Sequence, residues 1–272
     1  MHPQLHVFGL TLQSYSVMAA IAALTGAAMV WCPLKRCGFN AKQSVLMLLS
    51  MCAAFLAGAR LWNVAINPSS YGPLRPWYTP RMVGLSVYGG ILGALPVLAA
   101  FARLLHRPLR EVLDAFTVPF AAAFCLSRIG CFLNGCCAGI HTELPWGMVF
   151  PTALDGLQTP FMTLRSQPVH PTQLYELILA LVGIPVCLSL VRRFRLPAGA
   201  RFLIYEIWFC AMRLLVLPLR SLPYPSAVKT VLYPALYLVL MAGGGLLLVR
   251  LISGKSLRLS LNRDKKSGNP LC

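Results

Sequence analysis

The chain has 272 residues, of which 57% are hydrophobic and only 11% are charged. Soluble domains carry about 25% charged residues, so this composition excludes a protein whose whole surface faces water. The net charge of +17 is strongly basic, but the Lys and Arg residues lie between apolar blocks instead of forming one patch. This spacing excludes a nucleic-acid partner and favours cations that set membrane orientation and meet anionic lipid headgroups.

Seven apolar segments are long enough to cross a bilayer, which takes about 20 helical residues. We therefore expect an all-α polytopic membrane protein with spans at 14–31, 44–66, 82–105, 112–137, 172–191, 202–219 and 231–252. Residues 1–252 would form a single integral membrane domain, and residues 253–272 a basic cytoplasmic tail. The first six residues contain no Lys or Arg, so we expect the first segment to be kept as a membrane helix.

The loops on the two sides of these spans differ in their basic residues. Sixteen Lys and Arg residues fall on one side and five on the other. Loops rich in Lys and Arg stay in the cytoplasm. We therefore expect the N-terminus outside, the C-terminus in the cytoplasm, and the long loop 138–171 outside.

Three arginines, Arg60, Arg128 and Arg213, lie inside the expected spans. An arginine in the hydrocarbon core costs at least about 2.5–3.5 kcal/mol, so such a residue normally faces a cavity or a partner. Counting along each helix from its cytoplasmic start places all three in the middle-to-outer part of the membrane. They predict a polar site, open toward the outer face, that suits an anionic group.

Residues 127–139 read Ser-Arg-Ile-Gly-Cys-Phe-Leu-Asn-Gly-Cys-Cys-Ala-Gly. Three glycines in ten residues favour a bent or re-entrant backbone, which membranes tolerate only where it lines a cavity. Arg128 offers a planar donor fork for phosphate, and Asn134 offers a neutral donor and acceptor. The segment is therefore a candidate phosphate site.

This segment resembles the signature of the prolipoprotein diacylglyceryl transferase family, Gly-Arg-x-Gly-Asn-Phe-x-Asn-x-Glu-x-x-Gly. It matches that signature at Arg128, Gly130, Phe132, Asn134 and Gly139.

Other segments agree with the same family, in order, along nearly the whole chain. They are Gly-Ala-Arg-Leu at 58–61, the glycine-rich stretch 84–93, His-Pro-Thr-Gln-Leu-Tyr-Glu at 170–176, the arginines at 213 and 220, and Tyr15 at the opening of the first span. Seven spans with the N-terminus outside is also the family's topology.

The chain departs from the family pattern at several polar positions. The departures are Cys131 for Asn, Cys136 for Glu, Tyr88 for the His before the double glycine, Phe209 for Tyr and Leu217 for Glu. A phenol with a reference pKa of about 10 is a poor base near neutral pH. The phosphate-binding half of the family site is thus kept, and the acid–base half is changed.

The resemblance implies an enzyme of the bacterial inner membrane, a phosphatidylglycerol–prolipoprotein diacylglyceryl transferase. Such an enzyme transfers the diacylglyceryl group of phosphatidylglycerol to the lipobox cysteine of a prolipoprotein signal peptide, forming a thioether and releasing glycerol phosphate. The expected partners are phosphatidylglycerol, these signal peptides and membrane lipids. We expect no cofactor and no metal ion.

The resemblance also implies roles for individual residues. The expected catalytic residues are Arg128, Arg213 and Tyr88, and the expected substrate-binding residues are Arg128, Asn134, Arg60, Gly139, Tyr15, His170, Glu176 and Arg220.

Structural roles remain open for some of these positions. His170 and Glu176 also suit a helix start, and Arg60 a helix end. Arg128 and Arg213 have no acidic partner in their own segments, so we expect a bound phosphate to supply the negative charge. Arg220 is expected near the outer interface, where a lysine could still reach a headgroup.

Two other functions remain open at this point. Cys131, Cys136 and Cys137 could serve a membrane thiol oxidoreductase or a thiolate metal site, although their spacing fits neither C-x-x-C redox motifs nor ordinary zinc spacing. The changed acid–base half would also suit a non-catalytic relative that binds anionic lipid.

Overall fold

The computed structural model describes residues 4–7, 10–68, 71, 85–150, 167–222 and 224–267. Seven of its helices are long and apolar enough to cross a membrane. This confirms the prediction of an all-α, multi-pass membrane protein.

Six helices lie close to the expected spans, and the seventh continues to Ser267, beyond the expected end at 252. Their bounds are α1 Ser14–Arg36, α2 Ala41–Ile66, α3 Val87–Leu104, α4 Leu109–Leu133, α5 Thr172–Arg193, α6 Ala200–Val216 and α7 Tyr233–Ser267. A short 3-10 helix, η2 (Leu217–Leu219), prolongs α6, and a π-helical turn, η3 (Val228–Leu232), leads into α7. The expected start of the third span at 82 lies outside the described residues.

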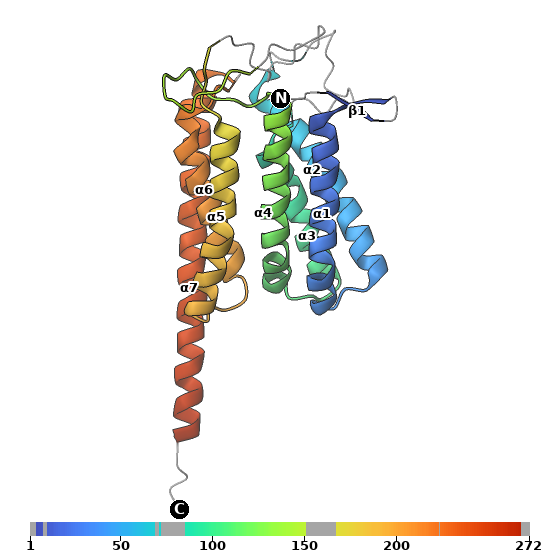
Figure 1. Ribbon diagram of the computed structural model, residues 1–272. Coiled ribbons are helices and arrows are strands. Elements are labelled where there is room, and N and C mark those ends of the chain that lie inside the picture. Colours follow the sequence, from blue (N-terminus) through green and yellow to red (C-terminus); the bar gives the residue numbers. More distant parts are fainter. Residues whose placement is uncertain are drawn as a thin grey trace, which may run out of the picture.

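A small antiparallel hairpin precedes the first span and was not predicted. Strand β1 (Gln4–Val7) pairs with β2 (Leu10–Gln13), with Leu5 opposite Leu12 and Val7 opposite Leu10. Apolar and polar residues alternate in both strands, which is the sequence signal of a strand. The hairpin lies beside the start of α1 (Figure 1).

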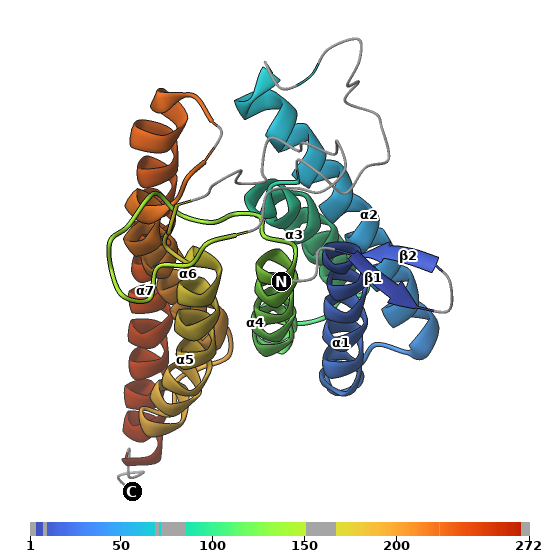
Figure 2. The same ribbon diagram turned by 45° about the horizontal axis from the view of Figure 1, so that its top comes forward.

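The helices form two groups that lie side by side in both views, α1–α4 and α5–α7 (Figures 1 and 2). Helix α4 joins them, because it packs on α1 in the first group and on α5 and α6 in the second. Within the first group α2 and α3 approach closely, since a Cβ on Gly89 would collide with the carbonyl oxygen of Gly58. Gly89 and Gly93 therefore serve helix packing, as small residues do in membranes.

The two ends of the bundle differ in their connections. Short turns join α1 to α2, α3 to α4 and α5 to α6 at one end. The other end carries the terminal hairpin, the end of α2, the start of α3 and the described parts of the connections after α4 and α6 (Figure 1). The last turns of α4 and the first turns of α5 meet at this second end.

The backbone of residues 127–139 differs from the expected bent span. Helix α4 continues through Gly130 and ends at Leu133, and the chain turns only afterwards, where Gly135 and Cys137 have φ values of 72° and 62°. Gly130 serves packing instead, because a Cβ there would lie 2.7 Å from the Cβ of Met18 on α1. The predicted break therefore lies one turn later than the first glycine of the motif.

Candidate functional site: three arginines around one glutamate

Three arginines from different parts of the chain converge on Glu176. Nη1 of Arg213 lies 2.5 Å from Oε1 of Glu176, and Nη1 of Arg220 lies 3.0 Å from the same oxygen. Nη1 of Arg128 lies 3.0 Å from Oε2. The Glu176 side chain is only 1% exposed, and the arginine side chains are also buried. The cluster thus joins α4, α5, α6 and the segment after η2.

This arrangement corrects two expectations from the sequence. The idea that a phosphate alone would supply negative charge to Arg128 and Arg213 is wrong, because Glu176 pairs with both. Arg220 is not an exposed interfacial residue, since its side chain is 7% exposed and bonds to the same carboxylate. The sequence could not show either point, because the partners lie 37 to 48 residues apart.

One carboxylate does not balance three guanidinium groups, so the cluster keeps two positive charges. Buried charges without partners are costly, and a site of this kind is stabilised by an anion. Within the part of the chain that the structure describes, the Nε atoms of Arg128 and Arg213 are buried without a hydrogen-bond acceptor. These donors and the surplus charge indicate a binding place for an anionic group.

Aromatic rings support two of the arginines. The guanidinium of Arg128 lies 4.7 Å from the ring centre of Phe124, one turn earlier on α4. The guanidinium of Arg213 lies 5.5 Å from the ring centre of Tyr88 on α3. Contacts of this kind are favourable and hold the planar group in place. The structure therefore brings Tyr88 to the site through its ring, which packs in turn on Tyr237 with ring centres 5.1 Å apart.

The start of α5 holds the loop that follows α4. Nε2 of Gln173 donates to the carbonyl oxygen of Cys136 at 2.6 Å, and Oγ1 of Thr172 donates to that of Cys137 at 2.8 Å. Gln173, Thr172 and Glu176 share the buried face of α5. Neither Gln173 nor Thr172 was among the predicted site residues, although their spacing from Glu176 places them on one helical face.

Gly139 holds the loop after α4 against His170 and against the end of η2. Its N–H donates to the carbonyl oxygen of His170 at 2.8 Å, and a Cβ at Gly139 would collide with the carbonyl oxygen of Leu219. Ser221 N–H donates to the carbonyl oxygen of Ala138 at 3.3 Å. Gly139 thus positions the chain next to Arg220, and only glycine fits there.

The other predicted residues are not among the three that pair with Glu176 in the described part of the chain. His170 is half-buried, and its Nδ1 lies 3.2 Å from the hydroxyl of Tyr175. Asn134 ends α4, where its N–H donates to the carbonyl oxygen of Gly130 at 3.0 Å. Arg60 is half-buried on α2 and is not one of the three arginines that pair with Glu176. Tyr15, on the first turn of α1, lies within electrostatic range of Arg128.

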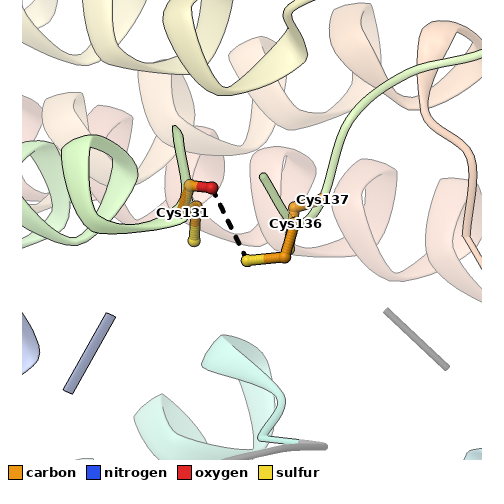
Figure 3. Close-up of side chains that lie close together, drawn as sticks. All are labelled: Cys131, Cys136 and Cys137. Carbon is orange, nitrogen blue, oxygen red and sulfur yellow. Dashed lines mark hydrogen bonds between the residues drawn. The ribbon is translucent and has the colours of Figure 1, made fainter. Parts of the chain in front are cut away.

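Three cysteines gather beside the arginines. The sulfur atoms of Cys131, Cys136 and Cys137 all lie within 4.8 Å of one another. Figure 3 shows Cys131 at the end of α4 facing the turn that carries the other two. The neighbouring thiols of Cys131 and Cys136, together with the charges of Arg128 and Arg220, lower the pKa of the Cys137 thiol well below its usual value. The sequence spacing did not indicate this convergence.

The fold and the site define a multi-pass helical membrane protein with a buried, positively charged cluster of side chains. Residues 3–250 match the sequence model of the family described as prolipoprotein diacylglyceryl transferase, so the chain belongs to this family. The match confirms the resemblance carried by the motifs at 127–139 and 170–176.

Curated relatives named phosphatidylglycerol–prolipoprotein diacylglyceryl transferase are similar over part of their length. The relative from Cupriavidus pinatubonensis is 33% identical over 165 residues, which are 60% of this chain and 56% of the relative. The relative from Bifidobacterium adolescentis is 28% identical over 235 residues, 80% of this chain and 68% of the relative. The relative from Cupriavidus metallidurans is 35% identical over 132 residues, which are 48% of this chain and 45% of the relative. The chain thus spans about half to two thirds of these relatives.

Proposed function

We propose that this protein transfers the diacylglyceryl group of phosphatidylglycerol to the cysteine thiol of a prolipoprotein lipobox. The observation that carries the proposal is the buried cluster of Arg128, Arg213 and Arg220 around Glu176, with two positive charges in excess. Family membership and the names of the relatives support it. The same family supports a place in the bacterial inner membrane, with the N-terminus outside and the C-terminus in the cytoplasm.

The reaction exchanges one bond to a glyceryl carbon for another. The thiol sulfur attacks that carbon, the C–O bond to phosphate breaks, and glycerol phosphate leaves. Negative charge therefore grows on the departing phosphate, and fixed cations beside it stabilise the transition state more than the ground state. Arg128 and Arg213 fill this role in our proposal, and Asn134 orients the headgroup.

Glu176 contributes by holding the arginines in place before the lipid arrives. A carboxylate that pairs with three guanidinium groups fixes their positions, so little reorganisation is needed when phosphate binds. Tyr88 supports Arg213 from the side, and Gly139 keeps Arg220 next to Glu176. His170, Tyr15 and Arg60 are proposed to contact the substrates farther from the reacting atoms.

The test is a transfer assay with purified protein, phosphatidylglycerol carrying a radiolabelled diacylglycerol group, and a lipobox peptide. Label in a peptide thioether is the expected result, and a peptide with Ser in place of the lipobox Cys should remain unlabelled. Binding of phosphatidylglycerol without transfer would replace the proposal with a non-catalytic anionic-lipid-binding relative. The family match does not favour the membrane thiol oxidoreductase that the cysteines suggested.

A further inference from the structure

The cysteine cluster has the geometry of an incomplete metal site. Its three sulfur atoms lie within 4.8 Å of one another, and Cys131 and Cys136 are buried while Cys137 is partly exposed. In a tetrahedral zinc site with Zn–S bonds of about 2.3 Å, two sulfur atoms lie roughly 3.8 Å apart. The sulfur atoms would therefore have to close by no more than about 1 Å to bind one ion.

The backbone around the cluster is already fixed. The left-handed conformations of Gly135 and Cys137 turn the chain back toward the end of α4, so two adjacent cysteines face Cys131. Gln173 and Thr172 hold the carbonyl groups of Cys136 and Cys137 from the rigid start of α5. A site held on helices and by such supporting hydrogen bonds keeps its ligands in position.

The neighbouring charges suit a thiolate cluster. Three thiolates and one Zn²⁺ carry a net charge of −1, and the charges of Arg128 and Arg220 act on Cys137. One of the two excess positive charges of the arginine–glutamate cluster would offset the negative charge of such a site, and one would remain for a phosphate. Soft thiolate ligands favour zinc or copper(I) over hard cations.

The number of ligands indicates what such an ion would do. Among the His, Cys, Asp and Glu residues that the structure describes, the group contains these three cysteines and no fourth member. Structural zinc sites have four protein ligands, whereas catalytic zinc sites have three and an open position. The three cysteines lie at the end of the bundle that carries the proposed phosphate site, because the charges of Arg128 and Arg220 act on Cys137.

We propose that Cys131, Cys136 and Cys137 bind one Zn²⁺ ion whose open position takes the thiol of the acceptor substrate. The inference rests on the proposed function, in which a thiol must become a thiolate. Tyr88 provides only a phenol for that purpose, with a reference pKa of about 10. Zinc deprotonates a bound thiol outright, so the chain would need no basic side chain.

The step balances without any oxidant or reductant. The substrate thiol loses its proton to water as its sulfur binds zinc. The sulfur then forms a bond to the glyceryl carbon of phosphatidylglycerol, and the C–O bond breaks with its electron pair on the phosphate oxygen. Glycerol phosphate leaves toward Arg128 and Arg213, and the neutral thioether, a weak zinc ligand, dissociates.

The first experiment measures metal binding without any transfer reaction. Purified full-length protein is reduced, stripped with a chelator, given Zn²⁺ or Cu⁺ in separate samples and desalted. We expect about one zinc ion per chain, bound to three sulfur atoms at about 2.3 Å by X-ray absorption. The variant C131S/C136S/C137S should lose it, and Cys125→Ser, which removes an isolated buried thiol of α4, should keep it.

Three results of this experiment would overturn the inference. They are no zinc retained by the reduced parent protein, equal zinc in the triple variant, and retention of Cu⁺ alone. Because the triple variant could fail to fold, Cys137→Ser is measured as well, with thermal unfolding of each variant. A folded Cys137→Ser protein that keeps zinc with three sulfur ligands also contradicts the proposal.

The second experiment tests the open position. Co²⁺ replaces Zn²⁺, and lipobox peptides with Cys or Ser are added. The Cys peptide should strengthen the sulfur-to-cobalt absorption band, and the Ser peptide should not. An unchanged band with the Cys peptide would show that the ion does not take the substrate thiol.

Transfer assays then separate this inference from the proposed function. We expect zinc-free protein and the triple variant to transfer at least about tenfold more slowly than zinc-loaded protein, and Cys125→Ser to match the parent. If zinc-free protein transfers at the full rate, the metal inference fails and the transferase stands. If zinc and the peptide thiol bind but no zinc-loaded sample transfers, the transferase proposal fails and the metal–thiolate site stands.

Discussion

Two buried or half-buried carboxylates, Glu176 and Asp114, lie at opposite ends of the helix bundle and have contrasting partners. Glu176 accepts hydrogen bonds from Arg213 and Arg220 and forms an ion pair with Arg128. Asp114 on α4 accepts from backbone groups at the start of α6, the N–H of Gly199 at 2.8 Å and that of Phe202 at 2.9 Å. Nη1 of Arg201 donates to the carbonyl oxygen of Asp114 at 3.4 Å.

The different partners of the two carboxylates suggest different roles, a structural role for Asp114 and a role in binding for Glu176. Asp114 satisfies free N–H groups at a helix start and complements the helix dipole, so its environment is already balanced. Glu176 lies among three full positive charges and balances one of them. Positive charge that remains after the protein partners are counted, more than burial alone, therefore marks the end of the bundle where we propose that an anion binds.

The largest effect is expected from Glu176→Gln. This change keeps the shape of the side chain but leaves three buried guanidinium groups without a counter-charge. Breaking a buried ion pair from one side costs about 3–5 kcal/mol, so we expect a loss of stability of that size. Thermal or denaturant unfolding in detergent micelles measures it, with and without phosphatidylglycerol. The lipid should restore part of the lost stability, because its phosphate replaces the missing charge.

The matched comparison is Asp114→Asn at the other end. Gly199 and Phe202 donate to different oxygens of Asp114, so the amide oxygen of Asn still accepts from one of the two backbone N–H groups. The loss should therefore be smaller than for Glu176→Gln, and phosphatidylglycerol should not change it. Equal losses in the two variants, or equal rescue by the lipid, would remove the distinction between the two carboxylates.

The next effect concerns the arginines themselves. Lysine keeps the charge but loses the planar fork that binds both a carboxylate and a phosphate. We expect Arg128→Lys and Arg213→Lys each to lower the transfer rate at least about tenfold, roughly 1.4 kcal/mol of transition-state stabilisation. Substitution by Ala should lower the transfer rate further at both positions. The assay uses folded protein at matched amounts with phosphatidylglycerol as donor.

Arg201→Lys beside Asp114 is the control for these substitutions, because it changes the same kind of side chain at the other end of the bundle. Its transfer rate should stay within about twofold of the parent. Near-parental rates for Arg128→Ala and Arg213→Ala together would exclude a phosphate clamp at this cluster.

The sequence predicted the helices well because a single physical rule governs them. A span needs about 20 apolar residues, and that requirement is visible without knowledge of any contact. The hairpin of β1 and β2 was missed because four-residue alternations are too short to stand out beside apolar runs of membrane length. The glycines of 127–139 predicted a bent backbone but not the position of the bend. The chain turns at Gly135, whereas Gly130 serves close packing against Met18.

Part of the site was also predicted, because it too follows from what the hydrocarbon core of a membrane tolerates. Arginines inside apolar spans are conspicuous, so Arg128 and Arg213 could be found from the free-energy cost of placing a charged side chain in the membrane. Their pairing with Glu176 depends on how three helices meet, which no local pattern contains. The convergence of Cys131 with Cys136 and Cys137 depends on the left-handed turn after α4, and C-x4-C-C spacing does not reveal that turn.

A smaller effect is expected from Asp114→Ala, which removes the acceptor for the start of α6. Loss of a helix cap typically costs about 1 kcal/mol, and the N–H groups of Gly199 and Phe202 would then lack this partner. Unfolding measurements should show this loss, while the transfer rate of the folded fraction stays close to that of the parent. A large fall in that rate would mean that the two ends of the bundle are coupled.

The smallest effect is expected from Tyr88→Phe, and it decides how Tyr88 serves the site. The ring centre of Tyr88 lies 5.5 Å from the guanidinium of Arg213, and the ring packs on Tyr237 and Tyr233. Phe keeps this ring and its contact with the cation, whereas Ala removes both. We therefore expect Tyr88→Phe to lower transfer by less than about threefold, and Tyr88→Ala to lower it much further. If the hydroxyl instead takes the proton of the substrate thiol, both variants should lose transfer to the same large extent. Measuring both across a range of pH separates the two roles, because loss of a base changes the shape of the pH profile and loss of a supporting ring lowers the rate at every pH.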